Sequence, residues 1–419
     1  MSKLLIEGGH RIKGEISVHG SKNSALPILA ATFLLDSQSV IKNCPKLTDV
    51  NVAMKILRYL GCEVTIEDNV ITVNPSDNIR SEIPDELMRE MRSSIVFLGA
   101  IISRAGKARI SMPGGCELGS RPIDLHLAAL EQLGVIINED HGYLECRCRG
   151  RLKGANISLS FPSVGATENI ILAASTAFGE TVIINAAREP EIVDLANFLN
   201  SCGAKISGAG ESIIVIEGVE KLSGCEHNVI PDRIVATTFM AFAATTRGEL
   251  LIKDINAEHI SSVIPLFKSA GCYIKQYNQN LYIRADERLN SVKMIRTMPY
   301  PGFPTDAQAQ LMAMSCYADG TSVFVESIFE NRFKHVPELT RMGAKINVEG
   351  RVAIVEGIAQ LHSASVKCTD LRGGASLVVA ALGANGLSDI SDIHHIDRGY
   401  ESIEKSLSSI GAYIKRVDA

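Results

Sequence analysis

Residues 57–66 read LRYLGCEVTI, and five further stretches of the chain repeat this order of an apolar helical segment, a glycine and an alternating segment. The other five are 130–139 LEQLGVIINE, 199–208 LNSCGAKISG, 267–276 FKSAGCYIKQ, 339–348 LTRMGAKINV and 407–416 LSSIGAYIKR. The spacings between successive repeat glycines are 73, 69, 68, 72 and 68 residues. Spacing this regular is typical of one structural unit that has been duplicated within a chain.

Hydrophobic periodicity changes at the glycine in the same way in each repeat. Ile403, Leu407 and Ile410 fall at i, i+4 and i+7 before the last glycine, which predicts one apolar helix face. After Gly61, apolar and polar residues alternate over 62–67, which predicts a half-buried strand. The glycine itself is expected to end the helix.

A second helix is predicted upstream in each repeat, and it is apolar on nearly all sides. Its six copies are ALPILAATFLL, IVFLGAII, ATENIILAA, IVATTFMAFAA, AQAQLMAMS and ASLVVAALGA. A helix of this kind has to be buried among other elements. We therefore expect an α/β protein whose units each combine one central helix, one half-exposed helix and several strands.

The six units are expected to form two domains of three units each, arranged about a pseudo-threefold axis. We predict a first domain at 22–230, and a second domain made of 1–21 together with 231–419, because Pro231 and the polar run before it suit a crossover. The first 21 residues would supply strands to the second domain. The active site is expected in the cleft between the two domains.

Polar residues open the predicted central helices in phase with the repeat. They precede their repeat glycines by 37 to 42 residues and are Lys22, Arg92, Ser163, Arg233, Asp306 and Arg372. Converging helix amino ends with cations suit phosphate or carboxylate ligands. Arg121 and Arg398 also share a phase, each 13 residues before its glycine. Both could bind one anion; alternatively each opens its helix, or pairs with Asp124 or Asp397.

Several candidate residues allow a second interpretation. Cys116 lies in the glycine-rich stretch MPGGCELGSRPIDL (112–125), where nearby Arg121 would favour the thiolate, but it could equally be an incidental surface thiol. Lys22 suits an anion, whereas Asn23 or Ser24 could simply cap the helix. Asp306 is either an N-cap or a general base. Asp370 and Arg372 likewise fit a cap or an anion site.

Composition excludes several classes of protein. A formal net charge of −5 argues against a general nucleic-acid binder. The ten cysteines are scattered without a C-x-x-C pair, so neither a disulfide framework nor a metal site is expected. No apolar run reaches membrane-spanning length and the amino end lacks a signal-peptide pattern, so we expect a cytoplasmic protein that does not bind membranes.

Nine segments together resemble the UDP-N-acetylglucosamine enolpyruvyl transferases, over the whole length of the chain. They are GSKNSALPILAA, MRSSI, PGGCELGSRPIDLH, SVGATENI, AAREPEIVDLANFL, FPTDAQAQ, IFENRFKHVPELTRMGA, TDLRGGASL and HHIDRGYESIE. The resemblance implies a two-domain inverted α/β barrel of the EPSP synthase-like class. It also implies transfer of enolpyruvyl from phosphoenolpyruvate to the 3-hydroxyl of UDP-N-acetylglucosamine, with release of phosphate. This reaction opens peptidoglycan precursor synthesis in the bacterial cytoplasm and needs no cofactor.

The resemblance also assigns residues to roles. Cys116 would protonate the methylene carbon of phosphoenolpyruvate, can form an adduct with it and would be alkylated by fosfomycin; Asp306 would accept the hydroxyl proton, and Lys22 and Arg398 complete the catalytic set. The residues matched to phosphoenolpyruvate are Lys22, Asn23, Arg121, Arg372 and Arg398. Those matched to the nucleotide sugar are Asn23, Arg92, Arg121, Pro122, Ile123, Asp124, Leu125, Ser163, Val164, Gly165, Asp306 and Ile328, with Asp370 elsewhere in the pocket.

Two departures and two rival functions accompany this assignment. Phe161 and Pro162 stand where some relatives have lysine, so diphosphate contact would depend on backbone and Ser163. Ser93 stands where relatives frequently have alanine.

A shikimate-3-phosphate enolpyruvyl transferase shares the fold, but the Cys116 loop argues against it. Six α/β repeats could also build a ring-shaped DNA clamp, which the acidic balance disfavours. The sequence makes no prediction of oligomeric state.

Overall fold

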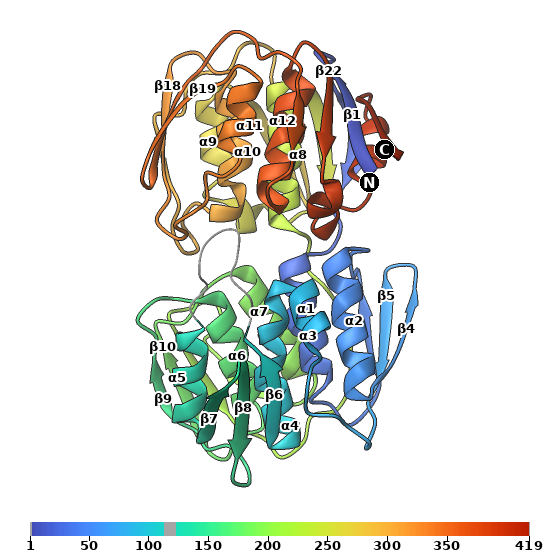
Figure 1. Ribbon diagram of the computed structural model, residues 1–419, viewed down its shortest axis with the longest axis vertical. Helices are drawn as coiled ribbons and strands as arrows, with labels where there is room; N and C mark the ends of the chain where they lie inside the picture. The colour runs from blue at the N-terminus through green and yellow to red at the C-terminus, as the bar shows by residue number, and fades with distance from the viewer. Residues whose placement is uncertain (1, 113–122, 419) are drawn as a thin grey trace. The chain divides into compact units, whose positions relative to one another are not determined.

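The computed structural model describes residues 2–112 and 123–418, which divide into two compact units. The first unit consists of residues 20–112 and 123–230, and the second unit of residues 2–19 and 231–418 (Figure 1). Each unit has its own hydrophobic core, one built from Ala25 to Val229 and the other from Leu4 to Ile414. Each also contains three copies of the repeat that the glycine spacing predicts.

The first unit contains the helices and strands of repeats one to three. Its helices are α1 (Lys22–Thr32), α2 (Thr48–Leu60), α3 (Asp85–Glu90), η1 (Arg92–Val96), α4 (Phe97–Ala105), α5 (Asp124–Gln132), α6 (Val164–Ala174) and α7 (Pro190–Ser201). Its strands are β3 (Ser39–Lys42), β4 (Glu63–Glu67), β5 (Val70–Asn74), β6 (Lys107–Ser111), β7 (Val135–Asp140), β8 (Tyr143–Cys148), β9 (Asn156–Ser158), β10 (Glu180–Ile184), β11 (Lys205–Ser207), β12 (Ile213–Glu217) and β13 (Glu226–Asn228).

The second unit contains repeats four to six and two strands from the amino end. Its helices are α8 (Arg233–Thr245), η2 (Ala257–Ile260), α9 (Ile264–Ser269), η3 (Thr305–Ala307), α10 (Gln308–Ser315), α11 (Val336–Arg341), α12 (Leu371–Gly383), η4 (Ile393–Arg398) and α13 (Ile403–Ser408). Its strands are β1 (Ser2–Gly8), β2 (Lys13–Ser17), β14 (Glu249–Lys253), β15 (Tyr273–Tyr277), β16 (Asn280–Arg284), β17 (Met294–Arg296), β18 (Thr321–Val325), β19 (Lys345–Glu349), β20 (Val352–Glu356), β21 (Ser365–Lys367), β22 (Gly386–Ser391) and β23 (Tyr413–Asp418).

Each repeat contributes a small sheet, and its neighbour supplies an edge strand. In the first unit, β13 from the end of repeat three pairs in parallel with β3 of repeat one, which closes the ring of three repeats. In the second unit, β2 pairs in parallel with β14, and β1 lies between β22 and β23. The sheet β6-β8-β7 has three strands, and the place of its parallel edge strand is taken by a single bridge between Glu82 and Arg109.

The central helices are buried as their composition predicts. Every residue of α8 from Ile234 to Thr245 is buried, and α8, α10 and α12 contact one another. Figure 1 shows α8, α10 and α12 between the strands β18 and β19 on one side and β1 and β22 on the other. Apolar side chains on all faces of these helices therefore have packing partners. The core is filled by the helix bodies, and polar residues can stand at the three amino ends.

All six repeat glycines adopt the left-handed conformation that stops a helix. Their φ angles are +111° at Gly61, +95° at Gly134, +99° at Gly203 and Gly271, +93° at Gly343 and +90° at Gly411. At Gly61 the backbone N–H returns to the carbonyl of Arg58, as at a helix end closed by a glycine. The predicted role of the repeat glycine as the helix stop is confirmed.

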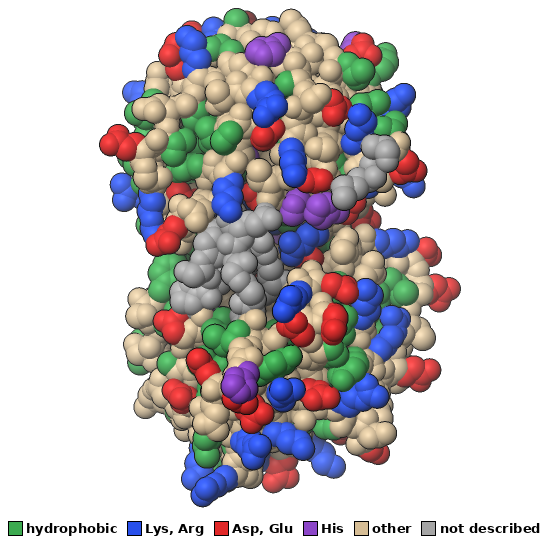
Figure 2. All heavy atoms as spheres, in the orientation of Figure 1, with side chains coloured by type: hydrophobic (Ala, Val, Ile, Leu, Met, Phe, Trp, Pro, Cys, Tyr) green, Lys and Arg blue, Asp and Glu red, His purple; other side chains and the backbone are tan. Residues whose placement is uncertain are grey.

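Charge is mixed on the surface of each unit. On the face drawn in Figure 2, Lys and Arg side chains are interspersed with Asp and Glu side chains over most of both units, and several Lys and Arg side chains gather at the lower end of the first unit. Among the helices of the described residues, none has the length and apolar character needed to cross a bilayer.

Candidate functional site

Two central helices of the second unit bring their polar amino ends together. Asp306 lies in η3, which leads into α10, and its Oδ2 is 2.9 Å from Nη2 of Arg372, the second residue of α12. Asp370 caps α12, since its Oδ1 accepts hydrogen bonds from the backbone N–H groups of Arg372 at 2.9 Å and Gly373 at 3.0 Å. The predicted convergence of helix starts therefore occurs between α10 and α12.

A second arginine holds the other oxygen of Asp306. Nη2 of Arg332 is 2.6 Å from Asp306 Oδ1, and the Arg332 and Arg372 side chains are each only 4% exposed, against 28% for Asp306. Two guanidinium groups bound to one carboxylate fix both its position and its plane. The remaining exposed edge of Asp306 is the part that a ligand can approach.

Electrostatics keep the neighbouring groups ionised. Burial alone would lower the pKa of Arg372, but the negative charges of Asp306 and Asp232 outweigh burial and raise it. Burial would likewise raise the pKa of the Asp370 carboxyl, whereas the charge of Arg332 and the N–H donors of α12 hold it below its ordinary value. The cluster at the starts of α10 and α12 therefore combines an ionised Asp370 carboxylate with an ionised Arg372 guanidinium at neutral pH.

His335 is a neutral group within the same cluster. It is 1% exposed and lies near Asp370 and Arg332. Burial, only partly opposed by the charge of Asp370, lowers the pKa of its imidazole from 6.5 to about 4. The ring is therefore uncharged at neutral pH.

Stability is expected to fall as the pH drops from 7 to 4.5, because the unfolded chain then binds a proton at His335 that the folded protein excludes. With the pKa lowered from 6.5 to about 4, this residue accounts for about 2 kcal/mol of that loss. We expect the free energy of unfolding of His335→Leu, measured in urea at both pH values, to fall by about 2 kcal/mol less than that of the wild type. Identical losses in the wild type and the variant would contradict this assignment.

Lys22 is the polar start of α1 in the first unit. Its Nζ is 3.0 Å from Oδ2 of Asp49 in α2, and the two side chains are 11% and 1% exposed. The interpretation of Asn23 or Ser24 as a helix cap is wrong: the N-cap is Ser21, and the Ser24 hydroxyl instead donates to Asp194. The side chain that opens α1 is thus a nearly buried cation paired with a buried carboxylate.

Three residues predicted to bind the nucleotide form the start of α6, and three more form the start of α5. Ser163 caps α6 by accepting from the N–H of Ala166 at 3.3 Å. A Cβ on Gly165 would lie 3.0 Å from the ring of His126, so α6 begins directly against α5. The His126 ring in turn contacts Asn169 of α6 at 2.8 Å. Residues 123–125 and 163–165 are therefore neighbours, as a shared ligand requires.

The other predicted site residues are distributed as follows. Arg398 ends η4 and is half-buried, while its neighbour Asp397 binds Arg416 through both oxygens at 2.9 and 2.6 Å. Ile328 follows β18, and Arg92 is the first residue of η1. Phe161 is 40% exposed at the approach to α6. Cys116, Arg121 and Pro122 lie outside the described residues.

Three residues near these positions were missed by the sequence analysis. Asp49, Glu326 and Arg332 are 1%, 1% and 4% exposed, and each bonds to or lies next to a predicted site residue. Arg332 stands in the segment IFENRFKH, but the sequence does not reveal that its partner is 26 residues upstream. A buried charge in an otherwise polar segment has no periodicity signal that could have identified it.

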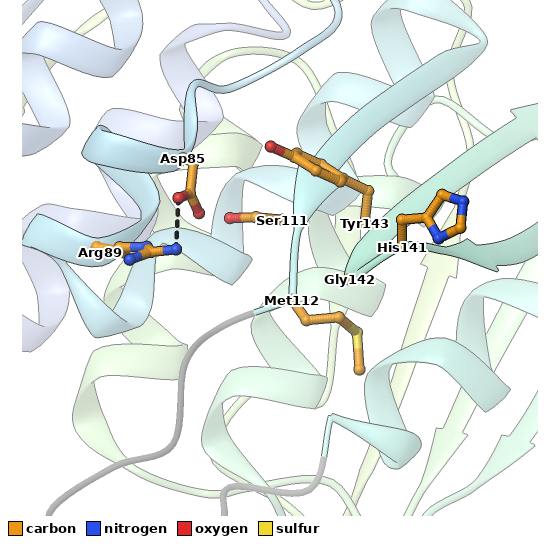
Figure 3. Close-up of a pocket in the computed structure, with 7 residues that line it drawn as sticks. All are labelled: Asp85, Arg89, Ser111, Met112, His141, Gly142 and Tyr143. Atoms are coloured by element: carbon orange, nitrogen blue, oxygen red, sulfur yellow. Dashed lines mark ion pairs between the residues drawn. The ribbon is translucent and has the colours of Figure 1, made fainter.

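A surface hollow of about 400 Å³ lies elsewhere in the first unit, at the end of β6. Figure 3 shows Asp85 and Arg89 paired on its α3 side, with Met112, Gly142 and Tyr143 on other sides. None of the predicted site residues lines this hollow, so it is not the candidate functional site. Within residues 2–112 and 123–418, no group of three or more His, Cys, Asp or Glu side chains is placed to hold a metal ion.

Comparison with known proteins gives consistent matches over the whole chain. The family described as EPSP synthase (3-phosphoshikimate 1-carboxyvinyltransferase) matches residues 6–407. A protein of Caldanaerobacter subterraneus subsp. tengcongensis named UDP-N-acetylglucosamine 1-carboxyvinyltransferase 2 is 54% identical over 418 residues, which is 100% of both chains. A protein of the same name from Carboxydothermus hydrogenoformans is 49% identical over 419 residues, again 100% of both.

Solved structures agree with this fold. The enolpyruvyl transferase NikO from Streptomyces tendae superposes with a TM-score of 0.90 at 25% identity, covering 100% of this chain and 99% of its own. EPSP synthase from Acinetobacter baumannii superposes with a TM-score of 0.76 at 17% identity over 100% of both chains, which bears on the fold alone. The predicted EPSP synthase-like fold class is confirmed.

Proposed function

The chain belongs to the EPSP synthase family, among the UDP-N-acetylglucosamine 1-carboxyvinyltransferases, and from this premise we propose that it transfers enolpyruvyl from phosphoenolpyruvate to the 3-hydroxyl of UDP-N-acetylglucosamine. Phosphate is released, and the product begins peptidoglycan precursor synthesis in the bacterial cytoplasm. The names and full-length identity of the relatives support the choice of acceptor. The observation that carries the chemical proposal is the carboxylate of Asp306, partly exposed and held by two buried guanidinium groups.

In the proposed reaction Asp306 takes the proton of the sugar hydroxyl as the oxygen attacks the central carbon of phosphoenolpyruvate. General base catalysis requires a carboxylate oriented before the substrate arrives, which the contacts with Arg332 and Arg372 provide. Cys116 would add a proton to the methylene carbon, so that positive charge develops on the neighbouring carbon. Phosphate would then leave with the electrons of the carbon–oxygen bond, and the methyl group made by that protonation would lose a proton to a base in the site, which restores the carbon–carbon double bond.

Cations are needed because phosphoenolpyruvate carries both a carboxylate and a phosphate. We propose that Lys22, Arg121, Arg372 and Arg398 bind these anionic groups, with Asn23 nearby, and that Asp370 keeps Arg372 in place at the start of α12. Bidentate arginine contacts suit both kinds of anion. The nucleotide sugar would contact Arg92, residues 121–125, Ser163, Val164, Gly165 and Ile328, in addition to Asp306.

Phosphate release is expected only when phosphoenolpyruvate and UDP-N-acetylglucosamine are both present. A coupled phosphate assay with each substrate alone and with both together measures this dependence. Release with shikimate 3-phosphate in place of the sugar nucleotide would instead assign the shikimate reaction. Retention of DNA at physiological salt without any turnover would favour the clamp.

Fosfomycin is expected to inactivate the enzyme and to add its mass to the peptide that contains Cys116. The reason is that Arg121, five residues after Cys116 in the sequence, is expected to favour the thiolate form of Cys116, whereas burial raises the pKa of the Cys44, Cys272 and Cys316 thiols to about 12. Peptide mass spectrometry after treatment locates the adduct. Labelling at Cys316 or Cys368 in place of Cys116 would refute the proposed role of Cys116.

A further inference from the structure

Glu326 directly follows β18 and is 1% exposed, yet its carboxylate is fully engaged by hydrogen-bond donors. Its Oε1 is 2.8 Å from Thr297 Oγ1, 2.8 Å from the N–H of Ile328 and 3.0 Å from the N–H of Phe329. Its Oε2 is 3.0 Å from Thr305 Oγ1. A buried carboxylate is tolerated only when donors of this kind replace its water.

The direction of the threonine contact identifies Glu326 as the acceptor throughout. Thr297 Oγ1 accepts a hydrogen bond from the N–H of Ser327 at 2.9 Å, so its single proton is free to point at Glu326. Both backbone groups are donors by nature. Glu326 therefore receives three hydrogen bonds on one oxygen and one on the other.

The four donors come from three segments that meet at one edge of a sheet. Because β17 and β18 are parallel, Thr297 after β17 and Ile328 after β18 leave the sheet on the same side. Thr305 opens η3 and directly precedes Asp306. One buried side chain thus joins the backbone of Ile328 to the segment that carries Asp306.

We propose that Glu326 is a positioning residue for the acceptor substrate, setting the Ile328 loop and the Asp306 segment at a fixed separation. This inference rests on the proposed function, in which Ile328 contacts the nucleotide sugar and Asp306 takes its hydroxyl proton. The hydroxyl must lie within hydrogen-bond reach of the base, so a small change in this separation affects both binding of the acceptor and the chemical step. Binding of phosphoenolpyruvate depends on other residues.

Glu326→Gln is the most direct test, because the amide keeps the shape of the side chain but replaces one acceptor with a donor. Oε1 would still face its three donors, while the amide nitrogen can only donate, so the Thr305 hydroxyl could no longer donate to this side chain and would have to turn and accept. We expect KM for UDP-N-acetylglucosamine to rise about tenfold and kcat to fall about tenfold, with KM for phosphoenolpyruvate unchanged within about twofold.

Two substitutions of Thr305 separate the hydrogen bond from the volume of the side chain. Thr305→Val removes the donor to Glu326 Oε2 at nearly constant shape, and is expected to lower kcat and raise KM for UDP-N-acetylglucosamine in the same direction as Glu326→Gln. Thr305→Ser keeps the hydroxyl and is expected to retain wild-type constants within about twofold. Glu338→Gln is the matched control, since Glu338 also accepts a backbone N–H, from Lys367 at 3.0 Å.

The outcomes distinguish a positioning role from a structural one. A purely structural role would lower kcat in proportion to the folded fraction measured by circular dichroism, leave both KM values unchanged, and overturn the inference. Wild-type constants in Glu326→Gln, or equal losses in Thr305→Ser and Thr305→Val, would also overturn it. If the wild-type protein itself releases no phosphate with UDP-N-acetylglucosamine, the proposed function fails and this inference fails with it.

Discussion

Replacing Asp306 with asparagine is expected to lower kcat by about a thousandfold, since a positioned general base contributes two to four orders of magnitude. The amide cannot accept the proton of the sugar hydroxyl. It also turns an N–H group toward one of the two guanidinium groups that now bind Oδ1 and Oδ2. The geometry of the side chain is kept, so the substrate site should remain formed.

Steady-state phosphate release and isothermal titration with UDP-N-acetylglucosamine measure the two effects separately. Binding of the nucleotide sugar should weaken by no more than about tenfold, because most of its contacts lie elsewhere. Asp319→Asn is the control, as Asp319 also pairs with an arginine of the second unit, at 3.3 Å from Arg288, but is 77% exposed. If the Asp306→Asn variant keeps a tenth or more of the wild-type kcat, Asp306 is not the general base.

Lys22→Met is the second change with a large expected effect, and it should act on both substrate binding and stability. The substitution removes a cation proposed to bind phosphoenolpyruvate, so KM for phosphoenolpyruvate should rise about a hundredfold. It also leaves Asp49, which is 1% exposed, without the Lys22 ammonium 3.0 Å away. Loss of one partner from a buried pair costs about 3 kcal/mol of unfolding free energy.

The double variant Lys22→Met with Asp49→Asn separates the two effects. The neutral amide removes the buried negative charge that has lost the Lys22 ammonium, so urea unfolding should show most of the lost stability restored. KM for phosphoenolpyruvate should stay as high as in the single variant, because the cation is still missing. Recovery of KM together with stability would mean that Lys22 acts only through its structural pair with Asp49.

Regular repetition explains why so much of the fold was predictable. The glycine that ends the half-exposed helix of each repeat requires a positive φ, and all six repeat glycines, from Gly61 to Gly411, have one. The central helices are apolar all round, and α8 is buried along its length. These are local consequences of composition and conformation, so a single sequence contains the information.

Edge pairing and helix starts were less predictable because they depend on distant segments. The bridge between Glu82 and Arg109 in place of an edge strand has no local signal. Asn23 and Ser24 resemble N-caps by residue type, yet Ser24 bonds to Asp194, which is 170 residues away. Asp306 was expected either as an N-cap or as a base, and Pro304 in fact occupies the N-cap position of η3.

The candidate site shows the same division. Lys22, Asp306 and Arg372 were identified from their phase in the repeat and from the resemblance to a family, and Asp370 from its place before a central helix and from the same resemblance. Asp49, the partner of Lys22, and Arg332, the partner of Asp306, were not identified, and neither was Glu326, which accepts from Thr305 and from the backbone of Ile328. A partner is chosen by three-dimensional proximity and leaves no spacing pattern. These partners determine how the predicted residues are held.

The central claim is that the carbon–oxygen bond of phosphoenolpyruvate breaks while its three-carbon group moves to the sugar nucleotide. Phosphoenolpyruvate with a heavy-oxygen label in the bridge between carbon and phosphorus tests this claim most directly, in a reaction with UDP-N-acetylglucosamine analysed by mass spectrometry. We expect all of the label in the released phosphate and an unlabelled enolpyruvyl group on the sugar nucleotide. Label that stays with pyruvate or with the three-carbon group would mean cleavage between phosphorus and oxygen, and would contradict enolpyruvyl transfer.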